Sequence, residues 1–440
     1  MNCTMNKLTY KRLFQLWYPL AFAWIMISAE GPFLTAIVAR LNAPRYNLAA
    51  YGISITLAML TEALVIMLLS TSTVFVNSKS NYYKVRTFTL ILTLSATSIL
   101  LLFSIKPVFN VLSNIMKLPE YIAILANRSI TILIPWPAAI GFRRFYQGIL
   151  IKNGKTNIIA LTTITRISTI LTSAFILMFL TKLPGAYIGA IALSSGVTLE
   201  AIITRIISNN TIKKILQAEN SDCDSPKLST IFKFYYPLAL TPIIGMSTST
   251  LITFFLGRSI NSIESLATMP VVGSFSFLFA SICYAYMELV IANLDKELCN
   301  IKKIKNFAYI IGLIVTIIYS IIVLSPAGIF YFHVISGLSN ILLPFALTGA
   351  RILIFLPIFS AITSIQRGIL IFLRKTYYVS SASFIELLII FISLSLLIKY
   401  SQWPGIVNAT LSLNFGRLSG ILFLVNYIKK IEKKIKQLYC

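Results

Sequence analysis

The sequence predicts an all-α integral membrane protein of about twelve transmembrane helices, in two parallel six-helix bundles related by a pseudo-twofold axis along the membrane normal. Composition, the length of the apolar runs and an internal repeat lead to this prediction. Of the 440 residues, 57% are hydrophobic and 12% are charged, whereas about 25% of a soluble domain is charged. The apolar runs are long and nearly free of charge, which indicates helices that span a bilayer rather than the strands of a barrel.

A repeat of about half the chain predicts two copies of one helical bundle. The tetrapeptide Tyr18-Pro19-Leu20-Ala21 returns as Tyr236-Pro237-Leu238-Ala239, a shift of 218 residues (236−18 = 218). Other matched positions lie 220 residues apart (357−137 = 220): Pro137 and Pro357, Gly148 and Gly368, Thr156 and Thr376. With six spans in each half, an even number, both copies have the same orientation in the membrane.

Apolar runs of about 20 residues mark the expected spans. We expect an N-terminal lobe at 1–207, a cytoplasmic linker at 208–229 and a C-terminal lobe at 230–440. The prolines in the fourth and tenth runs predict kinks. The runs are Leu13–Val38, Leu48–Val76, Thr87–Ile105, Tyr121–Leu150, Ile158–Leu180, Pro184–Ile207, Ile231–Leu256, Ala267–Ala292, Phe307–Leu324, Ile341–Leu373, Val379–Ile398 and Gly405–Tyr427.

The placement of basic residues predicts the orientation. The net charge is +25, and most Lys and Arg residues outside the spans fall in the loops on the side of the two termini. By the positive-inside rule, both termini are cytoplasmic. The Ile, Lys and Asn bias suggests an AT-rich bacterial genome, and we therefore expect a bacterial inner membrane. As partners we expect the lipid bilayer and a small anion and no nucleic acid, and we expect the chain to be a monomer.

Enzymatic chemistry has little support in the sequence. His333 is the only histidine, so neither a catalytic triad nor a histidine-based metal site can be assembled. The string from Gly148 to Thr156 looks like a phosphate loop, but five residues separate Gly148 from Gly154 and the string follows a membrane helix rather than a strand. We predict no enzyme, no metal and no cofactor other than a coupling H⁺ or Na⁺.

Charged residues inside the apolar runs are the candidate functional residues, because each costs at least about 2.5 kcal/mol at the bilayer centre unless it is paired or hydrated. The apolar runs contain eight arginines and five glutamates. This surplus of three positive charges favours an anionic cargo, whose oxygens match the planar guanidinium. The residues are Glu30, Glu62, Glu200, Glu288, Glu386, Arg128, Arg143, Arg144, Arg166, Arg205, Arg351, Arg367 and Arg417.

Among the arginines, Arg128, Arg351 and Arg417 are the candidates for binding an anion. Arg166 and Glu386 occupy equivalent repeat positions (386−166 = 220). They therefore either meet as a structural pair across the pseudo-twofold axis, or Arg166 contributes to substrate binding. The remaining arginines lie near cytoplasmic ends, where snorkelling to the headgroups is the simpler interpretation; they are Arg143, Arg144, Arg205 and Arg367.

Among the glutamates, Glu30 and Glu62 are candidates for coupling an ion. Glu30 precedes Gly31-Pro32, so a break in the first helix could free carbonyls beside its carboxylate. Burial as the partner of a neighbouring arginine explains either glutamate equally well. We expect pairing roles for Glu288 and Glu386.

These features resemble the multidrug, oligosaccharidyl-lipid and polysaccharide exporter (MOP) superfamily, whose fold is MATE-like. More narrowly, five short strings are similar to the progressive ankylosis family, which is tied to export of pyrophosphate, nucleotides and citrate. The resemblance implies acids at Glu30 and Glu288, while Thr35 stands where that family has an arginine. The strings are Ala50-Tyr51-Gly52-Ile53, Val74-Phe75-Val76-Asn77-Ser78-Lys79, Gly148-Ile149-Leu150-Ile151-Lys152, Tyr236-Pro237-Leu238-Ala239-Leu240 and Leu294-Asp295-Lys296.

We therefore expect an alternating-access secondary transporter that exports a small polyvalent anion such as pyrophosphate, a nucleotide or citrate. Two other carriers stay open: a proton- or sodium-coupled exporter of cationic drugs, with Glu30 as the coupling site, and a flippase for lipid-linked sugars. A membrane scaffold or regulator is the alternative outside the carriers. A major-facilitator fold is disfavoured, because the loop from Asn77 to Arg86 lacks a Gly-x-x-x-Asp-Arg signature.

Overall fold

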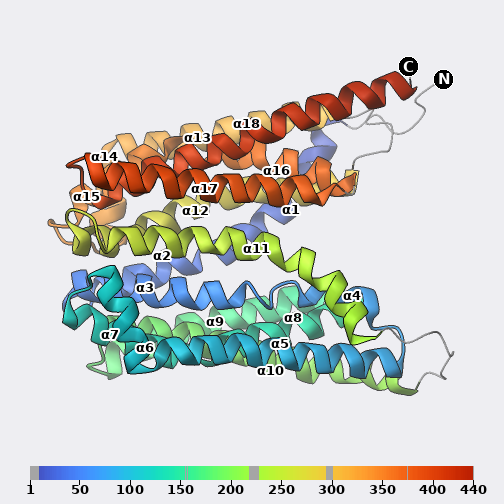
Figure 1. Cartoon of the computed structure of the whole chain (residues 1–440), viewed down its shortest axis with the longest axis horizontal. Helices are drawn as coiled ribbons and strands as arrows, with labels where there is room; N and C mark the ends of the chain where they lie inside the picture. Colours follow the sequence, from blue (N-terminus) through green and yellow to red (C-terminus); the bar gives the residue numbers. More distant parts are fainter. Residues whose placement is uncertain are drawn as a thin grey trace. The chain divides into compact units, whose positions relative to one another are not determined.

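The computed structural model describes residues 9–153, 155, 157–217, 227–293, 301–373 and 375–439. Its regular elements there are helices, with one isolated bridge between Ile260 and Pro404 (Figure 1). Among the described residues, eleven helices are long and apolar enough to cross a membrane. The predicted multi-span, all-helical membrane fold is thereby confirmed.

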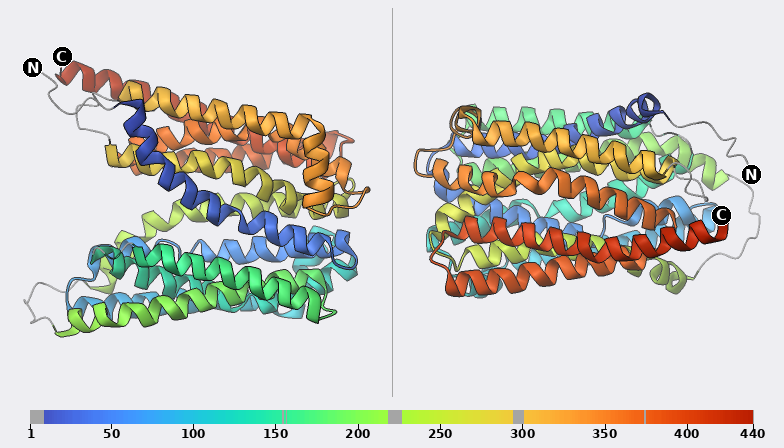
Figure 2. Two further views of the ribbon diagram at one scale, coloured as in Figure 1. Left: turned by 180° about the vertical axis from the view of Figure 1, so that it is seen from behind. Right: turned by 90° about the horizontal axis from the view of Figure 1, so that it is seen from above.

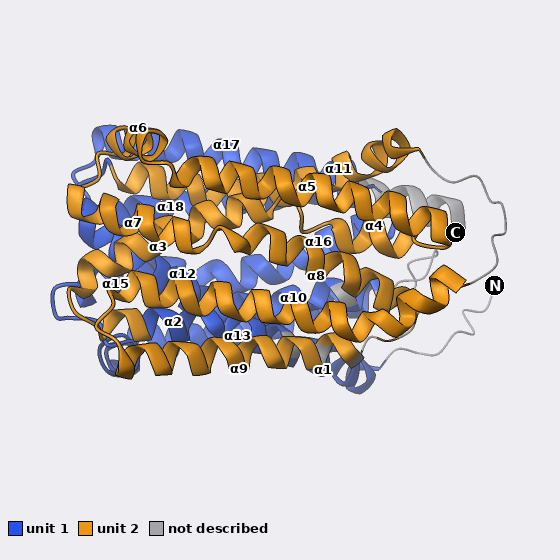
Figure 3. Cartoon of the chain, turned by 90° about the horizontal axis from the view of Figure 1, so that it is seen from below, with its two compact units in different colours: residues 1–36, 258–440 blue, residues 37–257 orange. Residues whose placement is uncertain are grey.

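The chain divides into two compact units (Figure 3). Unit 2 comprises residues 37–257 and unit 1 comprises residues 1–36 and 258–440. Unit 2 contains α3 (Pro44–Glu62), α4 (Leu68–Phe75), α5 (Lys79–Ser104), α6 (Lys106–Met116), α7 (Glu120–Ile132), α8 (Pro135–Lys152), α9 (Asn157–Leu180), α10 (Gly185–Gln217) and α11 (Leu228–Leu256). Unit 1 contains α1 (Tyr10–Ser28), α12 (Ser262–Asn293), α13 (Ile301–Leu324), α14 (Pro326–Ile329), η1 (Phe330–Ile335), α15 (Leu343–Ile352), η2 (Leu353–Phe355), α16 (Leu356–Phe372), α17 (Thr376–Tyr400) and α18 (Gly405–Tyr439), while α2 (Glu30–Ala39) runs from unit 1 into unit 2.

Proline accounts for most of the breaks in the long helices. The fourth predicted span is divided into α7 and α8 just before Pro135, and the tenth is divided into α15, η2 and α16 just before Pro357. A proline lacks the N–H that would continue the helical ladder and its ring crowds the preceding turn, so kinks at these two places were predictable. The expected break in the first helix is also present, at Ala29, three residues before Pro32.

The second predicted span is broken without a proline. Instead of one helix from Leu48 to Val76, the structure has α3 and α4 with a turn at residues 63–67, so this span is not among the eleven long helices. In that turn the Leu64 carbonyl accepts a hydrogen bond from the Tyr235 hydroxyl of α11. A carbonyl that leaves the helical ladder inside a membrane needs such a donor, and a tertiary contact supplies it.

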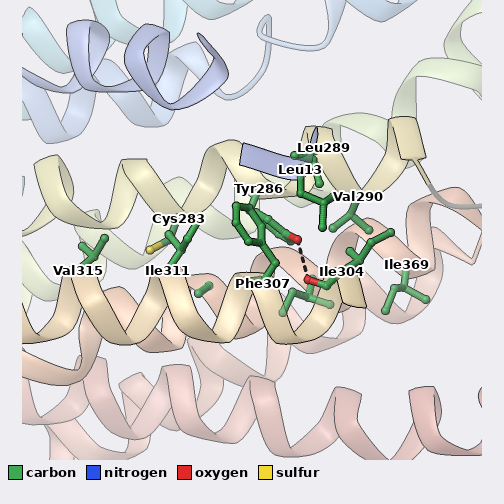
Figure 4. Packing of buried hydrophobic residues seen from close by; sticks show 13 residues of the cluster. Leu13, Cys283, Tyr286, Leu289, Val290, Ile304, Phe307, Ile311, Val315 and Ile369 are labelled. Carbon is green, nitrogen blue, oxygen red and sulfur yellow. Dashed lines mark hydrogen bonds between the residues drawn. The ribbon is translucent and has the colours of Figure 1, made fainter. Parts of the chain in front are cut away.

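The first helix packs against the helices of the second half of the chain, within unit 1 (Figure 2). Along α12, Trp17 Nε1 donates to the Ile282 carbonyl at 3.3 Å. Nearer the break, the Ser28 and Ser281 hydroxyls lie 3.0 Å apart. The buried apolar cluster of α1, α12, α13 and α16 includes Leu13, and in it Tyr286 donates to the Ile304 carbonyl at 2.6 Å (Figure 4).

The repeat is visible in these contacts. Trp17 and Tyr235 occupy equivalent positions (235−17 = 218), and so do their acceptors Ile282 and Leu64 (282−64 = 218). Both aromatic side chains donate to a carbonyl of the second span in the other half of the sequence. The compact units follow packing, whereas the predicted lobes follow the repeat, so the division into lobes at 1–207 and 230–440 stays a prediction.

The start of the predicted linker is part of a transmembrane helix. Residues 208–217 continue α10, where Thr211 is buried and accepts a hydrogen bond from Lys155 Nζ at 2.9 Å. Residues 208–217, which were expected to belong to the cytoplasmic linker, are therefore the end of the sixth span. Residues 218–226 of the linker and the string Leu294-Asp295-Lys296 lie outside the described residues.

Candidate functional site

In unit 2, four polar side chains from three helices meet inside the bundle. Glu200 of α10 is completely buried. Its Oε2 lies 2.5 Å from Arg143 Nη1 of α8 and 3.6 Å from Arg166 Nε of α9. Gln147 lies one turn after Arg143 on α8, and its Nε2 donates to Glu200 Oε1 at 3.5 Å. We call Arg143, Gln147, Arg166 and Glu200 the unit 2 cluster.

The cluster fastens α8, α9 and α10 to one another. A lone charge inside a membrane costs several kcal/mol, but a carboxylate held by charged donors is compensated. Backbone packing brings the helices close enough: a Cβ at Gly196 of α10 would lie 2.4 Å from Ile170 Cγ1 of α9. Only glycine fits there, so this residue fixes how near Arg166 comes to Glu200.

In unit 1, Glu386 of α17 forms a second cluster with two arginines. Its Oε2 lies 3.1 Å from Arg417 Nη1 of α18 and its Oε1 lies 3.4 Å from Arg367 Nη2 of α16. Arg417 Nη2 also lies 3.4 Å from the Tyr284 hydroxyl of α12. We call Glu386, Arg367, Arg417 and Tyr284 the unit 1 cluster. Its arginine side chains are 21% and 26% exposed, compared with 6% and 9% in unit 2.

A second carboxylate of unit 2 lies at the helix break. Glu62 is the last residue of α3, is 8% exposed, and its Oε2 accepts from Trp136 Nε1 at 3.0 Å. Arg144 of α8 is half-buried and within electrostatic reach of both Glu62 and Glu200. In the part of the chain that the structure describes, its Nε has no hydrogen-bond partner. Unit 2 therefore holds three arginines and two carboxylates in this region.

The structure brings several of the predicted residues together. Arg166 belongs to the unit 2 cluster, Arg417 and Glu386 belong to the unit 1 cluster, and Glu62 is within electrostatic reach of Arg144. The predicted pair of Arg166 with Glu386 joins residues of different units and stays a prediction. Within its own unit, each of the two already has a charged partner.

Other predicted residues lie elsewhere. Arg128 is exposed on α7, and Arg351 is exposed on α15, where its Nε donates to the Val323 carbonyl at 3.4 Å. Glu30 is half-buried at the first residue of α2. Glu288 lies on α12, and its side chain is outside the described part of the chain. The assignment of these residues to substrate, ion or pairing stays a prediction.

Snorkelling was the wrong expectation for two arginines. Arg143 is 5% exposed and Arg367 is a partly buried partner of Glu386, so both point into their bundles rather than toward headgroups. A carboxylate on a neighbouring helix offers stronger compensation than the headgroups do. Arg205 Nη1 donates to Asn209 Oδ1 at 3.0 Å, and its guanidinium lies over the Tyr146 ring, so snorkelling of Arg205 stays a prediction. Glu200 and Arg144 were counted among the intramembrane charges without a binding role, and Gln147 was not considered, since the sequence does not show which face of a helix meets which neighbour.

Similarity to solved structures identifies the fold. The chain matches an inward-facing multidrug resistance MATE family transporter of the MOP superfamily with a TM-score of 0.64 and 14% identity, covering 99% of this chain and 97% of that one. It matches the lipid II flippase MurJ in an inward closed conformation with a TM-score of 0.68 and 17% identity, covering 95% and 90%. It matches the eukaryotic MATE transporter AtDTX14 with a TM-score of 0.61 and 14% identity, covering 97% and 99%.

No protein-family model and no curated protein sequence matches the chain. The resemblance to the progressive ankylosis family therefore stays a prediction. The similarity to these solved structures shows the fold alone: the chain is a multi-span helical membrane protein that shares its fold with the solved MATE family transporters and with the lipid II flippase MurJ.

Proposed function

We propose that the chain is a secondary transporter that exports a small polyvalent anion, such as pyrophosphate, a nucleotide or citrate, by alternating access. The observation that supports this cargo is the charge of the buried clusters. In each unit one carboxylate is held between two arginines, so each cluster keeps one positive charge in excess. A membrane interior with uncompensated guanidinium groups attracts anions and repels cations.

Arg144 is the residue through which we expect the anion to bind in unit 2. The other two arginines there already contact Glu200, whereas the Nε of Arg144 is unfilled among the described residues. Its half-buried position leaves part of the side chain accessible. Glu62, within electrostatic reach of Arg144, is the candidate for the coupling ion, because an anion bound at Arg144 and this carboxylate together attract a cation.

Radiotracer flux in proteoliposomes tests the proposal. The purified chain is reconstituted, and counterflow of labelled pyrophosphate, ATP and citrate is measured. We expect flux of at least one of these anions, reduced about tenfold or more by Arg144→Gln, which removes a charge-assisted contact worth about 1.5–3 kcal/mol. The matched control is Arg86→Gln, an exposed arginine on α5 that is not among the candidate site residues, for which we expect flux close to that of the wild type. Absence of flux for all three anions, or equal loss in both variants, contradicts the proposal.

A cationic-drug exporter is the second candidate, and the position of Glu62 favours it. Glu200 and Glu386 each have two arginine partners, so a cation would use an acid outside the two clusters, and Glu62 lies at a helix break where carbonyls leave the ladder. Expression that confers resistance to cationic drugs, abolished by Glu62→Gln or Glu30→Gln, supports this candidate. Resistance unchanged in both variants counts against it.

A further inference from the structure

One turn of α8 carries three polar side chains, and the amide of Gln147 has a defined orientation. Gln147 is 2% exposed and its Nε2 faces Glu200 Oε1. A carboxylate only accepts hydrogen bonds, so the amide must present its N–H₂ group to Glu200 and its oxygen must point away. Within the described part of the chain, this Oε1 has no hydrogen-bond partner. The turn therefore has a buried acceptor without a donor.

The same turn has donors without acceptors. The Nε atoms of Arg143 and Arg144 are buried and lack hydrogen-bond partners among the described residues. Residues three and four positions apart on a helix are neighbours, so both arginines lie next to Gln147. Each unfilled buried group destabilises the folded chain, because its hydrogen bonds to water are lost without replacement. A ligand that accepts from the guanidinium groups and donates to the amide oxygen fills all three.

We propose that this turn of α8 binds an oxyanion that carries its own O–H group, of which hydrogen phosphate is the simplest. This inference rests on the proposed anion transport and narrows its cargo. Oxygens of the anion accept from Arg143 and Arg144, and the P–OH group donates to Gln147 Oε1. Near neutral pH phosphate keeps a proton and sulfate does not, although the two ions have the same shape. An oxygen of sulfate would place its lone pair against the lone pair of Gln147 Oε1, which is repulsive. The site therefore prefers hydrogen phosphate to sulfate.

Calorimetric binding of phosphate and sulfate to the purified chain in phosphatidylcholine nanodiscs tests this inference. We expect phosphate to bind about tenfold or more tightly than sulfate, because sulfate leaves the buried acceptor of Gln147 without a donor. In Gln147→Met, which keeps the side-chain length but removes the acceptor, the preference should fall to about twofold or less.

The matched control is Gln366→Met in unit 1. Gln366 is 5% exposed, donates to the Ile421 carbonyl at 3.2 Å and likewise has an unfilled Oε1 among the described residues. Its loss should leave the preference for phosphate unchanged. Equal binding of the two anions by the wild type, or a preference that survives Gln147→Met, overturns the inference.

Further measurements separate the remaining cases. If Gln147→Met does not fold, citrate and tricarballylate are compared on the unchanged chain; they differ by one hydroxyl, and equal binding overturns the inference. Nanodiscs that contain phosphatidic acid distinguish a lipid phosphate from free phosphate. If phosphatidic acid reduces the binding of free phosphate in the wild type, and does so less in Gln147→Met, the ligand of this turn is a lipid headgroup with the same chemistry. If the chain transports anions but does not distinguish phosphate from sulfate, only this inference is refuted. If it transports no anion, the proposed function is refuted.

Discussion

The two buried clusters have the same charge balance but have exchanged the positions of their charges. Arg166 of α9 and Glu386 of α17 occupy the same repeat position (386−166 = 220), one a base and the other an acid. Glu200, the acid of unit 2, is replaced by Gly420 in unit 1 (420−200 = 220). Each cluster nevertheless consists of one glutamate between two arginines on three equivalent helices.

This comparison teaches which property the bundle requires. The residue types at equivalent positions differ between the two halves. In both halves, however, ion pairs to one carboxylate connect the fourth, fifth and sixth spans. The clusters differ in burial, because Glu200 is completely buried and the arginines around Glu386 are about a quarter exposed. We therefore expect the unit 2 cluster to be more sensitive to the loss of a charge.

The largest expected effect is the loss of the buried carboxylate. Glu200→Gln leaves Arg143 and Arg166 as buried, uncompensated charges, and removal of one partner of a buried ion pair costs about 3–5 kcal/mol. Glu386→Gln is the matched variant in unit 1, where the arginines are about a quarter exposed, and we expect about half that loss. Thermal unfolding in detergent measures both. Equal losses in the two variants would show that burial does not distinguish the clusters.

A smaller effect is expected where the sequence places a glycine opposite a carboxylate. A Cβ at Gly420 would lie 2.4 Å from Glu386 Oε1, so Gly420→Ala displaces the carboxylate from its arginines and should cost about 1–3 kcal/mol. The control is Gly273→Ala on α12, where a Cβ meets nothing within 4 Å. That change should be neutral or slightly stabilising in the same unfolding measurement. A neutral Gly420→Ala variant contradicts the proposed close packing.

The smallest effect concerns the hydrogen bond at the broken span of unit 2. Tyr235→Phe removes the donor to the Leu64 carbonyl and should destabilise the chain by about 1 kcal/mol. Tyr236→Phe changes the neighbouring, 55% exposed tyrosine and should have no measurable effect. Comparison of the two melting temperatures tests whether this hydrogen bond supports the break; indistinguishable values argue that it does not.

The fold could be predicted from the sequence because its determinants are local or periodic. Apolar runs of membrane length, prolines in the fourth and tenth spans, and the 220-residue repeat are all readable without coordinates. The break between α3 and α4 was not predictable, since residues 63–67 contain neither glycine nor proline. A tertiary hydrogen bond from Tyr235 accompanies it instead.

The candidate site was only partly predictable. Sequence reasoning identified the charges within the spans, including Arg166, Arg417 and Glu386, but it could not identify their partners. Arg143 and Arg144 show why: they are adjacent in sequence, yet successive residues on a helix point about 100° apart. Arg143 forms an ion pair with Glu200, whereas Arg144 is within electrostatic reach of both Glu62 and Glu200. The rotation of each helix about its axis depends on packing between helices, which the sequence does not show.

The first helix of each half of the sequence packs in the unit formed mainly by the other half: α1 belongs to unit 1 and α11 belongs to unit 2. This arrangement has a consequence for the order in which the helices fold during translation. The hydrogen bond from Tyr235 to Leu64 spans 171 residues and that from Trp17 to Ile282 spans 265. All helices of unit 2 are therefore available for folding once α11 has been translated. In contrast, α1 is inserted first but can pack against α12 only after α12 has been translated. If translation stops after Leu256, we expect unit 2 to be folded while α1 still lacks its packing partners of unit 1. We therefore expect α1 to be the helix that an insertion chaperone would bind at this stage.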